Sequence, residues 1–250
     1  MNPELVAAAG LGLAPTYWAE RYPDRLALIT EHGNRTYSEL DTNANRLVRA
    51  LRRRGVQPGD GVALLCANRP EFVEAAAAVN RAGMRLTPIN CHLTGDEAGY
   101  VVDDCDATAF LADRRHAEAA SRAAEIAPRL RARLSIGGVI DGFDGYADAV
   151  AAEAGTPLAD PQLGERMLYT SGTTGNPKGV RRKTDVAALL AEAELSQYDA
   201  RRSVHLCTGP LYHAAPLSIS MTVPMAAGAP VVVMDLWDAE HAAADRPAPH

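Results

Sequence analysis

The sequence predicts an α/β protein in which parallel-rich sheets are covered by helices on both faces. Short apolar runs such as 62–66 are continuous rather than alternating, which is typical of strands buried on both faces. Segments with apolar residues every three or four positions separate these runs and predict helices between the strands. Hydrophobic residues make up 47% of the 250 residues but aromatic residues only 5%, which favours helix-rich layers over an all-β sandwich.

The first helix of this alternating pattern is strongly marked. A strand at 25–30 and a turn at 32–34 precede it. Thr36 followed by Glu39 forms a capping box, in which each side chain can bond to the other residue's backbone N–H. Gly55 ends the helix. One face of the helix carries apolar residues at helical spacing, namely Tyr37, Leu40, Ala44, Leu47 and Leu51.

The following elements repeat the same unit. A continuous apolar strand at 62–66 leads to a helix that we expect Asn68 to cap, with Pro70 in its first turn and Gly83 at its end. Thr94 and Glu97 form a second capping box. The rest of this half predicts strands at 85–89, 108–111 and 134–140, and helices from Thr94 toward Asp104 and at 117–126.

The second half of the chain has a weaker pattern. Residues 141–164 predict a helix and an acidic linker. Beyond a glycine-rich loop we expect a helix at 184–195, a strand at 204–207, a small-residue helix at 214–227 that Pro224 must kink or shorten, and a strand at 230–236. The expected domain organisation is a first αβ subdomain at 1–160, the start of a second with the loop at 161–238, and an irregular tail at 239–250.

Charge and cysteine usage exclude several functions. The net charge of −6 argues against a nucleic-acid partner, and the basic run 52–54 lies where a helix ends, where cations suit the helix dipole. The four cysteines lack metal-ligand spacing, so we expect reduced thiols and no metal site. No apolar run approaches the ~20 residues that span a bilayer, and residues 1–10 do not resemble a secretory signal. We therefore expect a cytoplasmic protein.

The stretch from Tyr169 to Val180, Tyr-Thr-Ser-Gly-Thr-Thr-Gly-Asn-Pro-Lys-Gly-Val, predicts a phosphate-binding loop. Its three glycines let the backbone approach a ligand closely and point N–H groups at anionic oxygens. Four Ser or Thr hydroxyls add donors, and Lys178 adds a compact positive charge. Lys178 and Lys183 are the only lysines among 25 basic residues, so a specific need for an ammonium group explains Lys178 better than residue usage does.

Other loop types fit this stretch less well. A Walker A loop requires Gly-Lys followed by Ser or Thr, whereas Pro177 precedes Lys178 and Gly179 follows it. The dinucleotide-binding pattern Gly-x-Gly-x-x-Gly does not follow a strand anywhere in the sequence. A glycine-rich hairpin turn is the structural alternative, but such turns need only about two to five residues and not this density of hydroxyls.

Together with Pro210-Leu211-Tyr212-His213, this loop resembles the adenylate-forming (AMP-binding) superfamily, which includes acyl-CoA synthetases, luciferases and the adenylation domains of peptide synthetases. Segments at 36–40, 59–64 and 88–90 are similar to the N-terminal portion of bacterial fatty acyl-CoA synthetases. The resemblance covers residues 15–238. It implies a partial N-terminal domain of an adenylate-forming enzyme.

The resemblance implies a two-step reaction on a fatty acid. The carboxylate attacks the α-phosphate of Mg-ATP to give an acyl-adenylate and pyrophosphate, and the thiol of coenzyme A then displaces AMP. By this resemblance the catalytic residues are Lys178, which offsets charge on the leaving pyrophosphate, and His213, which lies at the mouth of the acyl pocket. A histidine at a helix start is otherwise a cap or a core residue. The implied phosphate-binding residues are Thr170, Ser171, Gly172, Thr173, Thr174, Gly175 and Lys178.

Other parts that the resemblance implies do not occur in this sequence. They are a Tyr-Gly-x-Thr-Glu type motif for adenine and magnesium, a downstream Thr-Gly-Asp for the ribose, and a C-terminal catalytic lysine. Thr94-Gly95-Asp96 spells the ribose motif, but it precedes the loop and serves as a helix N-cap. Three hypotheses stay open: an active fatty acyl-CoA ligase, a truncated or frame-shifted fragment that at most binds phosphates, and one half of a split enzyme completed by another chain.

Overall fold

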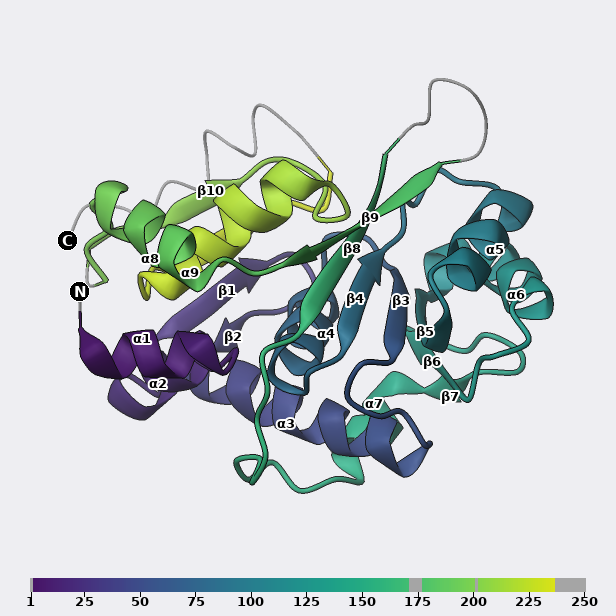
Figure 1. Ribbon diagram of the computed structural model, residues 1–250, viewed down its shortest axis with the longest axis horizontal. Helices are drawn as coiled ribbons and strands as arrows, with labels where there is room; N and C mark the ends of the chain where they lie inside the picture. Colours follow the sequence, from purple (N-terminus) through teal and green to yellow (C-terminus); the bar gives the residue numbers. More distant parts are fainter. Residues whose placement is uncertain (1, 171–176, 201, 237–250) are drawn as a thin grey trace.

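The computed structural model describes residues 2–170, 177–200 and 202–236, and its helices pack around two β-sheets (Figure 1). The strands are β1 (Leu26–Thr30), β2 (Arg35–Thr36), β3 (Gly61–Leu65), β4 (Arg85–Pro88), β5 (Ala107–Asp113), β6 (Ala132–Ile136), β7 (Asp144–Gly145), β8 (Glu165–Thr170), β9 (Lys178–Lys183), β10 (His205–Cys207) and β11 (Val231–Val233). The large sheet has the order β7-β6-β5-β3-β4-β8-β9, and the small sheet the order β10-β11-β1-β2.

Most neighbouring strands run parallel, which confirms the predicted parallel-rich α/β fold. Within the described residues, the antiparallel pairs are β1 with β2 and β8 with β9. The helices are α1 (Pro3–Gly10), α2 (Ala14–Arg21), α3 (Tyr37–Arg53), α4 (Pro70–Arg81), α5 (Gly95–Asp104), η1 (Arg114–His116), α6 (Ala117–Ile126), α7 (Tyr146–Ala151), α8 (Val186–Leu195), η2 (Pro216–Thr222) and α9 (Val223–Ala226).

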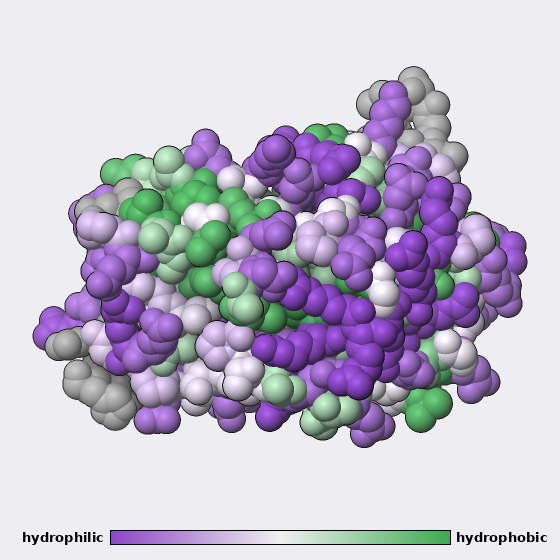
Figure 2. Space-filling model, turned by 60° about the horizontal axis from the view of Figure 1, so that its bottom comes forward, coloured by the Kyte–Doolittle hydropathy of each residue, from purple (hydrophilic) through white to green (hydrophobic). Residues whose placement is uncertain are grey.

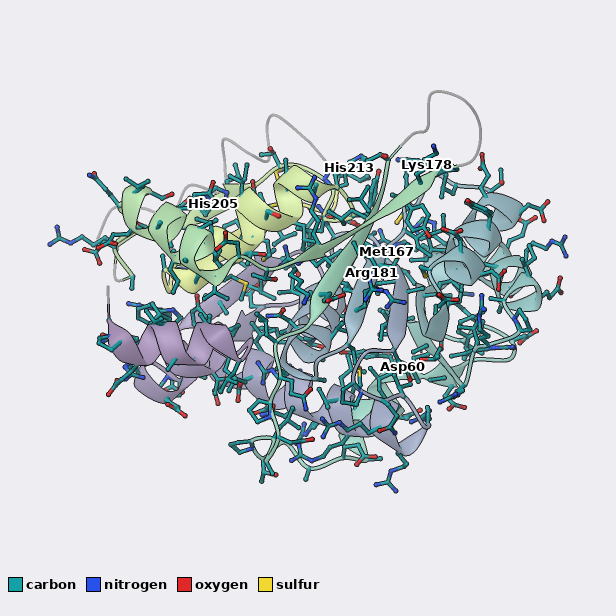
Figure 3. The ribbon with its side chains drawn as sticks, viewed as in Figure 1. Asp60, Met167, Lys178, Arg181, His205 and His213 are labelled. Carbon is teal, nitrogen blue, oxygen red and sulfur yellow. The ribbon has the colours of Figure 1, made fainter. Side chains whose placement is uncertain are left out.

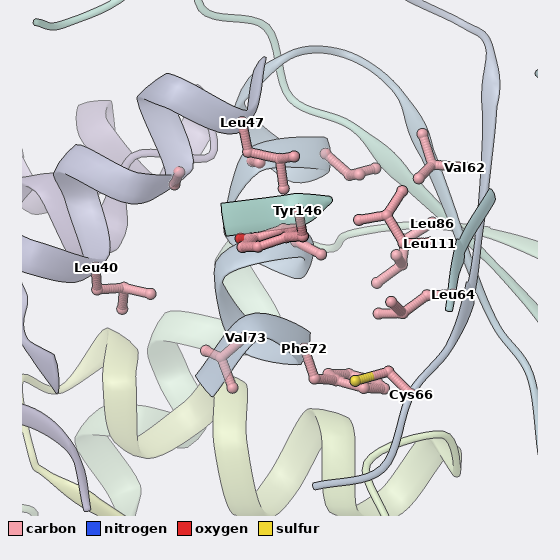
Figure 4. Packing of buried hydrophobic residues seen from close by; sticks show 14 of the residues in the cluster. Leu40, Leu47, Val62, Leu64, Cys66, Phe72, Val73, Leu86, Leu111 and Tyr146 are labelled. Carbon is pink, nitrogen blue, oxygen red and sulfur yellow. The ribbon is translucent and has the colours of Figure 1, made fainter. Parts of the chain in front are cut away.

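Helices cover both faces of the large sheet, as predicted, because its central strands are apolar on both sides. Val62 and Leu64 of β3 face a core that includes α3, α4 and α7, whereas Ala63 and Leu65 face α5 and α6. Figure 4 shows the first of these cores, in which the labelled side chains of α3, α4, β3 and α7 meet. Cys66, the last residue of the apolar run predicted at 62–66, also lies in this core, and burial raises the pKa of its thiol well above the ordinary value.

Both predicted capping boxes are present, because they depend on residues close in sequence. The Thr36 hydroxyl accepts a hydrogen bond from the N–H of Glu39 at 3.1 Å, and the Glu39 carboxylate accepts one from the N–H of Thr36 at 2.8 Å. Thr94 and Glu97 form the same arrangement at the start of α5, so the Thr94-Gly95-Asp96 triplet caps a helix. The five predicted apolar positions of α3 are fully buried.

Asn68 does not cap α4, contrary to prediction. The N-cap residue is Arg69, without a side-chain cap bond. The Asn68 amide instead donates to the carbonyl oxygens of Gly209 at 3.0 Å and Met234 at 2.8 Å, and its Oδ1 accepts from the N–H of Leu211 at 2.8 Å. Asn68 follows β3, while its partners follow β10 and β11, so this side chain joins the two sheets at their carboxyl ends.

The predicted small-residue helix is present, but Pro224 does not break it. The π-helical segment η2 leads directly into α9, which contains Pro224 and ends before Gly228. The Thr222 hydroxyl donates to the carbonyl oxygen of Leu217 at 2.7 Å, five residues earlier. A widened, π-helical turn thus precedes the proline, and the helix continues through Pro224 to Ala226.

The sheets combine segments from both sides of the predicted boundary between residues 160 and 161. Strands β8 and β9 extend the large sheet beside β4, whereas β1 and β2 pair with the late strands of the small sheet. The division into 1–160 and 161–238 stays a prediction. The predicted tail at 239–250 lies outside the described residues.

The arginines at the end of α3 have carboxylate partners. Arg52, Arg53 and Arg54 pair with Asp160, Glu153 and Asp144 respectively. Helix α3 ends at Arg53, which confirms the prediction of a helix end at this basic run. Figure 2 brings the underside of the molecule forward and shows hydrophilic residues over much of this face, with a hydrophobic area beside them.

Candidate functional site

The glycine-rich stretch connects the two strands of an antiparallel hairpin. Thr170 at the end of β8 pairs with Lys178 at the start of β9. Strand β9 was not predicted. The hairpin alternative and the phosphate-loop prediction are therefore compatible, because the loop is the connection of a hairpin. The remaining predicted phosphate-binding residues, Ser171, Gly172, Thr173, Thr174 and Gly175, lie outside the described residues.

Helix α5 holds both ends of this connection. The Tyr169 hydroxyl donates to the Asp104 carboxylate at 2.5 Å, and the Tyr100 hydroxyl donates to the carbonyl oxygen of Pro177 at 3.3 Å. Burial and the Asp104 carboxylate raise the pKa of Tyr169 well above its ordinary value, so the phenol stays a donor. Two contacts with α5, which lies more than 60 residues earlier in the chain, thus hold the strand ends from which the loop projects.

Gly179 is required where the two strands meet beside Tyr169. A Cβ atom at this position would lie 2.2 Å from the terminal methyl of Met167 and 2.9 Å from the ring of Tyr169. The methionine can move, but the tyrosine is held by Asp104. The glycine that follows Lys178 therefore serves close packing of the hairpin.

The structure brings the hairpin end and the His213 segment around one cavity of about 420 Å³. The cavity lies at the carboxyl ends of β4 and β8, where open α/β sheets bind ligands. Figure 3 places Lys178 and His213 at the same end of the hairpin. Lys178 directly follows a lining residue and is exposed. The lining residues are Pro88, Ile89, Asn90, Leu93, Val101, Leu168, Tyr169, Thr170, Pro177, Tyr212, His213 and Ala214.

His213 is neither a helix cap held by its side chain nor a core residue. Its backbone begins the turn before η2, since its carbonyl oxygen accepts from the N–H of Leu217 at 3.2 Å. The imidazole is exposed, and its ring centre lies 4.5 Å from that of Tyr212. Within the described ranges no hydrogen bond joins this imidazole to another side chain. It is therefore available to a ligand in the cavity.

A carboxylate and arginine cluster lies next to this cavity, and the sequence did not reveal it. The Asp235 carboxylate, which follows β11, forms hydrogen bonds with the imidazole of His32 at 2.9 Å and with the guanidinium of Arg115. Arg115 also donates a hydrogen bond to the Asp113 carboxylate at 3.1 Å. Although burial acts in the opposite direction, the hydrogen bonds from Arg115 and His32 lower the pKa of Asp235. The cluster joins residues that lie far apart in the sequence, so no local pattern indicated that they meet.

Metal-binding clusters and membrane-spanning helices are both absent from the described residues. Within 2–170, 177–200 and 202–236, no group of three His, Cys, Asp or Glu side chains is placed to hold a metal ion. None of the helices in these ranges is both long enough and apolar enough to cross a bilayer.

Comparison with known proteins agrees with this geometry. The family model of the AMP-binding enzymes matches residues 16–246. A medium/long-chain-fatty-acid–CoA/3-oxocholest-4-en-26-oate–CoA ligase of Mycobacterium tuberculosis is 37% identical over 182 residues, which are 67% of this chain and 32% of that protein. The 4-hydroxybutyrate–CoA ligase 2 of Metallosphaera sedula is 30% identical over 246 residues, which are 90% of this chain and 44% of that protein.

A solved structure shares the fold. A protein of Rhodopseudomonas palustris described as a long-chain-fatty-acid CoA ligase superimposes with a TM-score of 0.82 at 26% identity, over 94% of this chain and 60% of that one. By the coverages given above, this chain spans less than half the length of each of the two curated relatives. The match extends from within α2 to beyond β11 and includes the hairpin and His213. The chain belongs to the family of AMP-binding enzymes, whose curated relatives here are acid–CoA ligases.

Proposed function

We propose that this chain forms the phosphate- and acyl-binding part of a ligase that joins a carboxylic acid to coenzyme A through an acyl-adenylate. The observation that carries the proposal is the shared cavity: Thr170, at the end of β8, and the exposed His213 both line it, and Lys178 lies at the same hairpin end. Family membership supplies the reaction type.

The proposed chemistry assigns a task to each of these groups. A carboxylate oxygen of the acid bonds to the α-phosphorus of ATP while the bond to the bridging oxygen of pyrophosphate breaks. The Lys178 ammonium offsets the charge that builds up on the leaving pyrophosphate. His213 donates a hydrogen bond to the reacting carboxylate or α-phosphate and holds it in the cavity. In the second step the sulfur of coenzyme A bonds to the acyl carbon and AMP leaves.

The remaining substrate assignments are part of this proposal. The Mycobacterium tuberculosis relative is named for medium- and long-chain fatty acids and a steroid acid, and the Metallosphaera relative for 4-hydroxybutyrate. The common feature is a carboxylic acid, and we propose a fatty acid for this chain. ATP, Mg²⁺ and coenzyme A follow from the family. We also propose a cytoplasmic location, which is compatible with the four free cysteines.

A second candidate is a protein that binds phosphates without catalysis. The observation that favours it is the exposed Lys178 at the hairpin end, which suits a phosphate whether or not adenylation follows. The match covers 32% and 44% of the two curated relatives. In each of those relatives the matched segment belongs to one longer chain, so we do not extend the proposal to a separate partner chain.

Acid-dependent exchange of labelled pyrophosphate into ATP tests the two candidates. We expect exchange with a fatty acid, and we expect Lys178→Ala to reduce it to background while Lys183→Ala leaves it unchanged. ATP binding without any exchange would refute adenylation and support the phosphate binder. Equal exchange by the Lys178 variant and the unaltered chain would overturn the role of that residue.

A further inference from the structure

A second cavity continues from the candidate site along β8. Side chains two residues apart on a strand share a face, so Arg166, Leu168 and Thr170 face the same way. Leu168 and Ala214 line both the candidate site and a neighbouring cavity of about 340 Å³, which Arg166 also lines. Thr170 and Arg166 are four positions apart along β8, a distance of about 13 Å. The two cavities thus lead from His213 at one end to Arg166 at the other.

The charge of Arg166 is not neutralised by any carboxylate in the described part of the chain. Its guanidinium donates to the hydroxyls of Thr222 at 2.8 Å and Ser218 at 3.4 Å, which are both neutral. Burial alone lowers its pKa to about 10, so the group keeps its charge at neutral pH. Asp185 and Glu192 line the same cavity, but neither pairs with Arg166, and Asp185 caps α8 through the N–H of Ala188.

A second arginine on the same face strengthens the positive charge. Arg166 lies directly opposite Arg182 in the β8–β9 register, so both side chains are on one face of the hairpin and line the same cavity. Like charges in directly opposed positions destabilise a hairpin. On the opposite face, Arg181 pairs with Glu165 at 2.7 Å. Glu165 therefore neutralises the charge of Arg181, whereas Arg166 and Arg182 have no carboxylate partner in the described part of the chain.

Apolar side chains form part of the lining of this second cavity, beside its charged and hydroxyl groups. Leu168, Leu189, Ala214 and Val223 line the cavity that Arg166 reaches. A ligand that fills both cavities thus meets the exposed His213 at one end and the charge of Arg166 at the other, with apolar side chains along part of its path. An aliphatic chain with a carboxylate at each end matches this arrangement.

We propose that Arg166 selects acyl substrates that carry a second carboxylate, so that the preferred acids are α,ω-dicarboxylic acids bound with their far carboxylate on this guanidinium. This inference rests on the proposed function, because it takes the candidate site to hold the carboxylate that is activated. Arg166 is a specificity-determining residue in this account and does not take part in adenylation.

Calorimetric titration of the chain with dodecanedioic acid and with its monomethyl ester tests this proposal. The two ligands have the same carbon chain, and the ester carries a methyl group in place of the negative charge at one end. We expect the diacid to bind at least about tenfold more tightly, since a charge-assisted hydrogen bond of the far carboxylate contributes that much. Equal affinities in the unaltered chain would overturn the proposal without any variant. Suberic, sebacic and hexadecanedioic acids then locate the length that spans the cavities.

Matched variants assign the preference to one arginine. Arg166→Met should abolish the preference and leave the affinity for the monomethyl ester unchanged, whereas Arg166→Lys should restore part of it. Arg181→Met is the control on the other face and should keep the full preference. An Arg166→Met chain that still prefers the diacid would contradict the proposal.

The pyrophosphate exchange assay separates this inference from the proposed function. Exchange with dodecanoic acid but no advantage for the diacid would refute the inference alone. Binding of neither acid, together with no exchange, would refute the proposed function as well.

Discussion

The side-chain amide of Asn68 donates a 2.8 Å hydrogen bond to the carbonyl oxygen of Met234, 166 residues later in the chain. The same side chain bonds to Gly209 and Leu211, so one buried residue joins the carboxyl ends of both sheets. The candidate site lies at these ends, between β4 and β8 of the large sheet and the segment that follows β10. The relative position of Thr170 and His213 therefore depends on how the two sheets are held together.

Replacement of Asn68 should destabilise the whole fold. In Asn68→Ala, two carbonyl oxygens and one N–H lose their partner in a buried place, and we expect the free energy of unfolding to fall by about 2–4 kcal/mol. Asn34→Ala is the matched control, because Asn34 makes one exposed bond to the N–H of Thr30. Denaturant unfolding measures both, and equal losses would contradict the role of Asn68.

Replacement of Gly179 should disturb the hairpin at the candidate site. The added Cβ of Gly179→Ala would lie 2.9 Å from the Tyr169 ring, so we expect a loss of about 1–3 kcal/mol in the free energy of unfolding and a weaker Tyr169–Asp104 bond. Gly10→Ala is the control, because nothing lies within 4 Å of the added atom there. If both variants unfold at the same denaturant concentration, the packing argument is wrong.

The Asp235 cluster should make stability depend on pH. The folded pKa of Asp235 is lowered, chiefly because the bonds from Arg115 and His32 outweigh burial. Its stabilisation is therefore complete above the unfolded pKa of about 3.9 and is lost as the pH falls through the lower folded pKa. We expect Asp235→Asn to lower the free energy of unfolding by about 1–3 kcal/mol at neutral pH, and this difference should shrink at acidic pH. A difference that does not change with pH would show that the carboxylate charge is not responsible.

The parts of the fold that depend on nearby residues could be predicted from the sequence. Both capping boxes and the buried face of α3 follow from spacings of three or four residues. The pairing of β1 with β11 and the role of Asn68 could not, because they join segments that lie more than a hundred residues apart. Strand β9 was missed because its sequence, Lys-Gly-Val-Arg-Arg-Lys, is too polar to show a buried strand.

The candidate site was predictable in its residue types but not in its geometry. The glycines, hydroxyls and Lys178 indicate phosphates by their chemistry, and His213 followed from the family resemblance. The opposed pair Arg166 and Arg182 depends on the hairpin register, which no local pattern specifies. The cavity that this pair lines therefore became visible only in the structure.

The affinity of the chain for ATP in two lysine variants tests the central claim, that Lys178 holds phosphates at the end of the hairpin. Lys178 and Lys183 are the only lysines of the chain and lie at opposite ends of β9, so Lys183→Ala is a matched control. We expect Lys178→Ala to raise the dissociation constant for ATP, measured by calorimetry, about tenfold or more. We expect Lys183→Ala to leave this constant unchanged. Equal affinities of the unaltered chain and the Lys178→Ala variant would contradict the account.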